Sequence, residues 1–222
     1  MVDFAWETAA LAACAQENAL VAGMDEVGRG ALAGPVCVGL AIINADCLDA
    51  GFPAGLRDSK ALTPARREAL VPPLREWLYD FAIGEATSDE IDEFGIMSGL
   101  RLAGWRALNE VDARGNLPQR LLLDGNHNFL AAPRQPTLFN RFSDLGSGVE
   151  IAVDTLVKAD DTAATVAAAS VLAKVYRDSF MRTLPDAGYG WSHNVGYATK
   201  EHREAIARLG ASRWHRQSWK LV

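Results

Sequence analysis

Long apolar runs are scarce in this sequence of 222 residues. The apolar stretch at 32–43 is too short to cross a bilayer as a helix, and Gly34 and Pro35 interrupt it. No basic segment opens the chain, where the acidic residues Asp3 and Glu7 stand instead. We therefore expect a cytoplasmic protein that has no membrane partner.

Cysteine is also scarce. Cys14, Cys37 and Cys47 cannot all pair with one another, and no two of them stand in a C-x-x-C spacing. This pattern argues against a disulfide framework. We expect three reduced cysteines that serve as packing residues.

Histidines are few, and they suggest no acid–base pair. Catalysis by a general acid and a general base often uses two histidines that lie close together. His127, His193, His202 and His215 offer no evident pair in the sequence. We expect each of them to have a surface or capping role, with His202 on an exposed helix face.

The chain has no overall excess of basic residues, since 22 Lys and Arg stand against 28 Asp and Glu, for a net charge of −6. Nucleic-acid binders usually present a basic surface, so the total charge argues against a polyanionic partner. The distribution reverses this conclusion, because residues 171–222 carry nine Lys or Arg and four Asp or Glu. The acidic excess lies in the preceding part of the chain, where metal ligands would come from.

The order of predicted elements indicates one α/β unit. Helical periodicity and capping residues predict helices over 4–20, 96–111, 162–184 and 199–209, and a helix that starts at Thr63-Pro64 and is broken or kinked at Pro72-Pro73. Apolar runs predict strands over 20–24, 36–43, 81–86 and 120–123. The polar residues 126–147 are expected to form a surface excursion. Strands that alternate with helices imply a mixed sheet covered by helices.

Acidic residues follow several of the apolar runs. Asp25 and Glu26 end the first predicted strand, Asp124 ends another, and Asp160 and Asp161 precede a long helix. A buried strand is rigid, so a carboxylate at its exit is held near the domain edge, and the exits of neighbouring strands converge. Carboxylate oxygens are the ligands that Mg²⁺ and Mn²⁺ prefer. The sequence therefore predicts a divalent-metal site.

Each of these positions also has a simpler interpretation, because an Asp at a strand end is more often a turn former or a helix cap. The pair Asp25-Glu26 is less ordinary, since adjacent acids repel each other unless a cation or hydrogen bonds compensate. Two metal ions about 3.5 to 4 Å apart can activate a water and stabilise the leaving oxygen of a phosphodiester. Four clustered carboxylates would suit that chemistry.

Ordered motifs run through nearly the whole chain. They are Met24-Asp25-Glu26-Val27-Gly28-Arg29-Gly30, Leu32-Ala33-Gly34-Pro35-Val36, Asp58-Ser59-Lys60, Leu123-Asp124-Gly125, Val157-Lys158-Ala159-Asp160, the alanine-rich run 167–175, Gly196-Tyr197 and His215-Arg216. In this order they closely resemble the motifs of ribonuclease HII, the type 2 ribonuclease H of bacteria. The resemblance covers residues 21–219.

This resemblance implies an α/β, ribonuclease H-like fold: a five-stranded mixed sheet flanked by helices, with a small helical C-terminal part. Residues 1–184 would form the catalytic domain with its N-terminal helix, and residues 185–222 a helical segment that packs on it and helps to bind substrate. We expect a single compact unit and a monomer.

The activity implied by the resemblance is endonucleolytic. The family hydrolyses RNA in RNA–DNA hybrids and nicks duplex DNA on the 5′ side of an embedded ribonucleotide, which leaves 3′-hydroxyl and 5′-phosphate ends. Its catalytic, metal-binding carboxylates correspond to Asp25, Glu26, Asp124 and Asp160, which would hold two Mg²⁺ or Mn²⁺ ions. Asp161 would be a helix cap or a weak outer group.

Substrate-binding residues also carry over from the family. Its sensor for the RNA–DNA junction is a Gly-Arg-Gly loop with a tyrosine, and these correspond to Gly28, Arg29, Gly30 and Tyr197. Glycines let backbone groups approach the ribose and read its 2′-hydroxyl, and an aromatic ring can stack on the neighbouring sugar or base. Without the resemblance, a tight turn and a core aromatic would be the simpler interpretations.

Basic residues of the motifs are candidates for phosphate contacts, which set register without reading sequence. Lys60 resembles a phosphate-contacting residue of the family, with Ser59 beside it. Weaker candidates are Lys174, Arg177, Arg213 and Arg216.

Two positions depart from the family pattern. The family usually has a lysine two residues before the tyrosine, where this chain has Val195, and often an asparagine where it has Gly95. Both changes bear on how tightly the substrate is bound.

Two other hypotheses for the function stay open. One is an integrase or resolvase with the same sheet and acidic cluster, which needs no 2′-hydroxyl sensor. The other is a protein that binds nucleotides or phosphates at the Gly-rich loop and catalyses no reaction.

Overall fold

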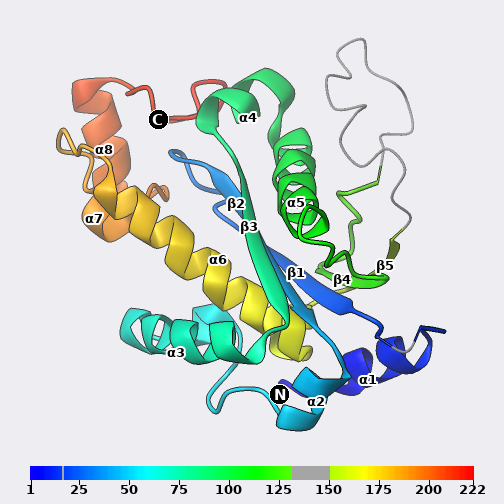
Figure 1. Ribbon diagram of the computed structural model, residues 1–222. Helices are drawn as coiled ribbons and strands as arrows, with labels where there is room; N and C mark the ends of the chain where they lie inside the picture. The colour runs from blue at the N-terminus through cyan, green and yellow to red at the C-terminus, as the bar shows by residue number, and fades with distance from the viewer. Residues whose placement is uncertain (17, 132–150) are drawn as a thin grey trace.

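The computed structural model describes residues 1–16, 18–131 and 151–222, so the predicted excursion beyond residue 131 lies outside the described part. A five-stranded sheet in the order β3-β2-β1-β4-β5 forms its centre (Figure 1). The strands are β1 (Val21–Val27), β2 (Val36–Ile43), β3 (Asp80–Ala86), β4 (Arg120–Asp124) and β5 (Ala152–Leu156). The β1–β2 and β2–β3 pairs are antiparallel, and the β1–β4 and β4–β5 pairs are parallel. The predicted mixed sheet is confirmed.

Helices cover both faces of the sheet. They are α1 (Ala5–Ala12), α2 (Ala45–Ala50), α3 (Pro64–Trp77), α4 (Ser88–Phe94), α5 (Ile96–Asp112), α6 (Ala164–Thr183), α7 (Trp191–Asn194) and α8 (Lys200–Leu209). Figure 1 shows α5 on one side of the sheet and α6 on the other. One apolar cluster lies between the sheet and α5, and a second lies where α3 and α6 meet the sheet. Within the described ranges, no helix has the length and apolar character that crossing a membrane requires.

Two strand glycines let α6 lie directly on the sheet. A Cβ atom on Gly23 would overlap the backbone of Thr165, and a Cβ atom on Gly39 would overlap the carbonyl of Ala169. The first half of α6 consists of small residues that are almost completely buried. Gly39 stands opposite Asp25 in the register of β1 and β2. The close approach therefore brings α6 up to the position of Asp25.

The N-terminal helix supplies a buried cap for α6. Glu7 is fully buried, and its Oε1 accepts hydrogen bonds from the backbone N–H and the hydroxyl of Thr165, each over 2.8 Å. α1 is shorter than the helix predicted over 4–20, because the chain must turn into the sheet. The Leu20 N–H donates to the Gln119 side chain over 2.6 Å, and the Leu20 carbonyl accepts from the Gln119 N–H over 2.9 Å.

The helix that was predicted to break or kink at Pro72-Pro73 does not break there, since α3 runs through both residues. A proline inside a helix removes one N–H donor and clashes with the preceding turn, at a cost of about 3 kcal/mol. Leu74 is completely buried and Trp77 nearly so, on the side of α3 that faces the core. Burial of this apolar face compensates for the backbone hydrogen bonds that the two prolines cannot make.

The C-terminal segment packs against the end of α6. The cluster there consists of Leu32, Ala33, Met181, Leu184, Tyr189, Trp191, Val195, Ala205 and Ile206. As predicted, α6 stops just before Pro185, Thr199 caps α8 by accepting from the His202 N–H, and Gly210 follows the helix end with a positive φ. The three cysteines are free, and Cys37 and Cys47 are buried, as predicted.

Candidate active site

Three neighbouring strands end at one edge of the sheet, and each brings an acidic residue there. Asp25 lies on β1 and Asp124 is the last residue of β4, and the parallel register places their preceding residues side by side. Asp160 lies in the short 3-10 helix Ala159–Asp161, which follows β5. The Ala159 N–H donates to Asp124 Oδ1 over 2.7 Å, so this turn is tied to the end of β4.

A cleft of about 420 Å³ opens at this edge of the sheet. The residues selected from the sequence that line it are Asp25, Glu26, Gly28, Arg29, Gly30, Ser59, Lys60, Asp124, Lys174 and Tyr197. Asp160 is joined to the cleft through Lys60, whose Nζ lies 2.8 Å from Asp160 Oδ2. The neighbouring Asp161 is exposed. Residues from β1, the Gly-rich loop, β4, α6 and the C-terminal segment thus meet around one space.

The carboxylates at the cleft are buried and close enough to repel one another. Asp25 is 5% exposed, and burial, together with the charges of Glu26 and Asp124, raises its pKa to about 7 against a hydrogen bond from Ser170. Burial also raises the pKa of Glu26, although the Arg29 guanidinium lies 3.5 Å away and opposes this shift. A cation placed among these carboxylates would relieve both the desolvation and the repulsion.

Lys60 provides one such cation. Its Nζ lies 2.8 Å from Asp160 and 3.8 Å from Asp58. Burial opposes protonation, but the hydrogen bond to Asp160 and the charges of Asp160 and Asp25 outweigh it and raise the pKa of Lys60. The Lys60 side chain is 71% exposed, so it reaches the carboxylates from the solvent side.

The donor set fits a hard divalent ion in its chemistry, because the groups are desolvated carboxylates without sulfur or nitrogen ligands. In the part of the chain that the structure describes, however, no three His, Cys, Asp or Glu side chains are drawn together tightly enough to hold an ion by themselves. The charge balance of Asp160 rests on the Lys60 ammonium instead. The carboxylates would have to move closer together to share a metal.

The Gly-rich loop is held from inside by two arginines. Arg177 and Arg216 are completely buried. Arg177 donates to the carbonyl oxygens of Ala33, Pro35 and Val195 over 2.8 to 2.9 Å. Arg216 donates to the carbonyl oxygens of Gly28, Arg29 and Gly34 over 2.7 to 3.3 Å. The suggestion that these two arginines contact phosphate is therefore wrong, since both guanidinium groups are buried and bind backbone carbonyls of the protein interior.

Gly28 is a position that only glycine fits. Its φ is +84°, and a Cβ atom there would overlap the Arg177 side chain. A Cβ atom on Gly30, in contrast, would meet no heavy atom within 4 Å and would point into open space. The first glycine of the loop thus serves its packing, and the second leaves backbone accessible at the cleft.

Tyr197 lines the cleft from the C-terminal segment, next to the loop. The Leu32 and Ala33 N–H groups donate to the carbonyl of Gly196 over 2.8 and 3.2 Å, which fixes the tyrosine segment to the loop. The half-buried Tyr197 ring has Lys174 Nζ 5.2 Å and Arg177 Cζ 5.4 Å from its centroid. These cations stabilise the ring at the cleft wall.

Ser170 is a site residue that was not singled out from the sequence. It lines the cleft from α6, and its hydroxyl lies 2.8 Å from the hydroxyl of Ser59. Ser170 is buried and forms a hydrogen bond with Asp25. A single hydroxyl that follows three buried alanines on one helix was the signal that could have revealed it.

Comparison with known proteins identifies the family. The model of the ribonuclease HII family matches residues 22–222. The chain belongs to the ribonuclease HII family. The ribonuclease HII of Streptomyces avermitilis is 41% identical to it over 202 residues, which are 90% of this chain and 76% of that protein. That of Paracoccus denitrificans is 39% identical over 222 residues, which are 99% of this chain and 92% of that protein. Family membership makes the chain a hydrolase of the ribonuclease H type.

Solved structures agree with this assignment. The ribonuclease H2 of Pyrococcus horikoshii OT3 is 28% identical with a TM-score of 0.60, and the ribonuclease HII of Archaeoglobus fulgidus, solved in a complex with PCNA, is 25% identical with a TM-score of 0.66. Each comparison covers 91% of this chain and 94% of the other. The predicted ribonuclease H-like fold is confirmed.

The two departures from the ribonuclease HII pattern have structural correlates. Val195 has a φ of 43°, which is unfavourable for a β-branched residue, and its buried side chain belongs to the C-terminal apolar cluster. Gly95 has a φ of 80° between α4 and α5, and glycine adopts this conformation without strain. Neither residue lines the cleft.

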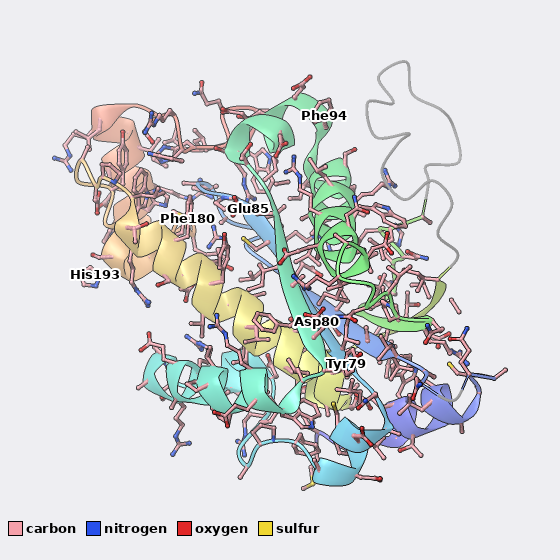
Figure 2. All side chains as sticks on the ribbon, in the orientation of Figure 1. Tyr79, Asp80, Glu85, Phe94, Phe180 and His193 are labelled. Atoms are coloured by element: carbon pink, nitrogen blue, oxygen red, sulfur yellow. The ribbon has the colours of Figure 1, made fainter. Side chains whose placement is uncertain are left out.

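Two of the histidines differ from expectation. His202 and His215 are completely buried, and their Nε2 atoms lie 3.1 Å apart. The expectation that His202 lies on an exposed helix face is therefore wrong, and the two rings form a buried pair that was not evident in the sequence. His127 and His193 are exposed, as expected, and Figure 2 shows His193 projecting outward from α7.

Proposed function

We propose that this protein hydrolyses RNA endonucleolytically in RNA–DNA hybrids and incises duplex DNA on the 5′ side of an embedded ribonucleotide, leaving 3′-hydroxyl and 5′-phosphate ends. The observation that carries the proposal is the meeting of carboxylates and the Gly-Arg-Gly loop around one cleft. Acidic residues alone would suit many nucleases. The adjoining loop gives a means to recognise the ribose at the scissile position.

Four carboxylates would hold the metal ions: Asp25, Glu26, Asp124 and Asp160. Two bound Mg²⁺ or Mn²⁺ ions supply an activated water and charge stabilisation for the leaving 3′ oxygen. The protein keeps these carboxylates in place through the strand ends and through the Ala159 N–H, which donates to Asp124 over 2.7 Å. Burial of Asp25 strengthens its attraction to a cation.

The substrate is an RNA–DNA hybrid or a DNA duplex that contains ribonucleotides. Backbone groups of Gly28, Arg29 and Gly30 approach the ribose and read its 2′-hydroxyl. Tyr197 stacks on the neighbouring sugar or base. Lys60, with Ser59 beside it, contacts a phosphate from its exposed position at the cleft.

The C-terminal segment takes part in substrate binding. We assign residues 1–184 to the catalytic domain and residues 185–222 to a helical segment packed on it. The segment contributes Tyr197 to the cleft, and its buried Arg216 holds the carbonyls of Gly28 and Arg29. Loop and tyrosine thus form one recognition surface.

The test is a cleavage assay on a DNA duplex with a single ribonucleotide, with Mg²⁺, Mn²⁺ or EDTA. We expect cleavage on the 5′ side of the ribonucleotide with either metal, and none with EDTA. Asp124→Asn should abolish cleavage and keep the fold, because the amide oxygen can still accept from the Ala159 N–H. Near-normal activity of Asp124→Asn, or equal cutting of an all-DNA duplex, would refute the proposal.

A further inference from the structure

A chain of hydrogen bonds runs through the C-terminal segment and ends on the backbone of Tyr197. His202 Nδ1 lies 2.8 Å from the Tyr197 carbonyl oxygen, and His202 Nε2 lies 3.1 Å from His215 Nε2. His215 Nδ1 lies 2.9 Å from the N–H and 2.8 Å from the hydroxyl of Ser212. Both imidazole rings are completely buried.

The partners determine which ring nitrogen carries each proton. A carbonyl oxygen only accepts, so His202 must donate from Nδ1 to Tyr197, which leaves its Nε2 as an acceptor. His215 must then donate from Nε2 to His202. Its Nδ1 is left to accept from the Ser212 N–H. When both rings are neutral, the hydrogen bonds therefore all run in one direction, from Ser212 through His215 and His202 to Tyr197. All four ring nitrogens then have a partner.

The surroundings keep both rings neutral. Burial lowers the pKa of His202, and burial together with the neighbouring His202 lowers the pKa of His215 to about 4. The charged groups nearby are Asp186, which favours the protonated form of His202, and Arg203, which opposes it. The Tyr189 ring lies against both imidazoles, with centroids 6.4 and 4.8 Å away.

The backbone of Tyr197 makes two further hydrogen bonds. Its N–H donates to the Asn194 carbonyl over 2.9 Å, and its carbonyl accepts from the Thr199 N–H over 2.8 Å in addition to His202. The two residues before it have positive φ values, so the backbone there depends on tertiary contacts for its shape. The buried chain of histidines supplies such a contact at the tyrosine itself.

We propose that His202, His215 and Ser212 act as positioning residues that set the Tyr197 backbone, and through it the selectivity for a single embedded ribonucleotide over a continuous hybrid. The inference rests on the proposed function, since it takes Tyr197 as a substrate contact. A continuous hybrid offers ribose contacts at many positions, whereas a single ribonucleotide depends on the junction. Misplacement of the tyrosine therefore weakens junction cleavage more than hybrid cleavage.

Two substitutions at one position separate positioning from simple packing. His202→Asn places an amide N–H where Nδ1 stands and keeps the bond to Tyr197, but it loses the contact with His215. His202→Gln places its amide where Nε2 stands and keeps the contact with His215, but it loses the bond to Tyr197. Both remove a buried ring, so a merely structural role predicts similar losses of thermal stability and of activity on both substrates.

The measurement is kcat/KM of wild type and both variants, with Mn²⁺, on a duplex with one ribonucleotide and on an RNA–DNA hybrid. We expect His202→Gln to lower the junction-to-hybrid ratio by about tenfold, as the loss of one buried hydrogen bond implies, mainly through KM. His202→Asn keeps the bond to Tyr197 but loses the support of His215, so it should lower the ratio by only about threefold. Equal ratios in the two variants would overturn the inference.

An unstable variant and an inactive wild-type protein would each lead to a different conclusion. If His202→Gln is too unstable to isolate, His215→Asn replaces it, because it keeps an acceptor for Ser212 and removes the donor to His202. It should lower the ratio by about threefold, and an unchanged ratio would overturn the inference. A wild-type protein that cleaves neither substrate would instead refute the proposed function, and this inference with it.

Discussion

The guanidinium of Arg216 donates a hydrogen bond of 2.7 Å to the carbonyl oxygen of Gly28, a residue 188 positions earlier in the chain. The same side chain donates to the carbonyls of Arg29 and Gly34, and it is completely buried. Backbone carbonyls of a tight loop need partners when they are buried. One arginine from the C-terminal segment therefore stabilises the part of the loop that lines the cleft.

Removal of Arg216 should destabilise the protein strongly. Arg216→Ala leaves the buried carbonyls of Gly28 and Arg29 without this donor and creates a cavity, so we expect the free energy of unfolding to fall by about 3 kcal/mol. Arg213→Ala is the matched control, because Arg213 is exposed and contacts the Trp214 ring at 4.6 Å. Arg213→Ala should lower the free energy of unfolding by less than about 1 kcal/mol. Urea unfolding of both variants decides this, and equal losses would contradict the role of Arg216.

Metal binding should stabilise the folded protein. The buried Asp25 and its acidic neighbours repel one another without a cation, so Mn²⁺ should raise the free energy of unfolding by about 2.7 kcal/mol at a concentration of 100 times Kd. Asp124→Asn should lose most of this gain. Asp161→Asn, which changes an exposed neighbour of Asp160, should keep the gain and the cleavage activity. Thermal unfolding with Mn²⁺ and with EDTA measures the difference, and loss of the gain in Asp161→Asn would mean that the wrong aspartate was assigned.

Acid should destabilise the protein through its buried histidines. The pKa of His215 is about 4 in the folded state, below the ordinary value of about 6.5 in the unfolded chain. The unfolded chain therefore binds a proton that the folded one does not, and the free energy of unfolding falls as the pH drops through this window. Between pH 7 and pH 5 the loss from His215 is about 2 kcal/mol. Asp186 remains charged there, because backbone N–H groups outweigh burial and lower its pKa.

Urea unfolding at pH 7 and pH 5 tests this dependence. His215→Asn should be less stable than wild type at pH 7 and should lose less stability on acidification. The exposed His193 provides the control, and His193→Gln should keep the wild-type difference between the two pH values. If the free energy of unfolding of His215→Asn fell as much between pH 7 and pH 5 as that of wild type, the buried ring would not titrate in this window.

Local patterns predicted the elements that carry the carboxylates. The apolar runs before Asp25 and Asp124 became β1 and β4, because a buried strand needs a continuous apolar sequence. The alanine-rich run became α6, and its small side chains fit against Gly23 and Gly39. β5 was not located along the chain, since this edge strand is largely exposed and has no apolar run.

Residues whose environment is set by distant segments could not be predicted. Arg177 and Arg216 look like solvated side chains in the sequence, and only the loop carbonyls 142 to 188 positions away explain their burial. His202 lies on an amphipathic helix, where a polar residue is normally exposed. Its burial depends on His215, which follows thirteen positions later and completes its hydrogen bonds.

The two glycines of the Gly-Arg-Gly loop should respond differently to the same substitution. Gly28→Ala places a methyl group against Arg177 at a φ of +84°, so it should lower the free energy of unfolding by about 2 kcal/mol or more. Gly30→Ala meets no heavy atom within 4 Å and should leave stability within about 0.5 kcal/mol of wild type.

Activity then separates packing from substrate contact at this loop. Gly30 lines the cleft, so a methyl group there occupies space that the ribose would need, and cleavage of a singly ribo-substituted duplex should fall by about tenfold or more in a fully folded protein. Gly28→Ala should lose activity and stability together. A Gly30→Ala variant with wild-type kcat/KM would place the ribose elsewhere, because a substrate that passes over this backbone cannot avoid the added methyl group.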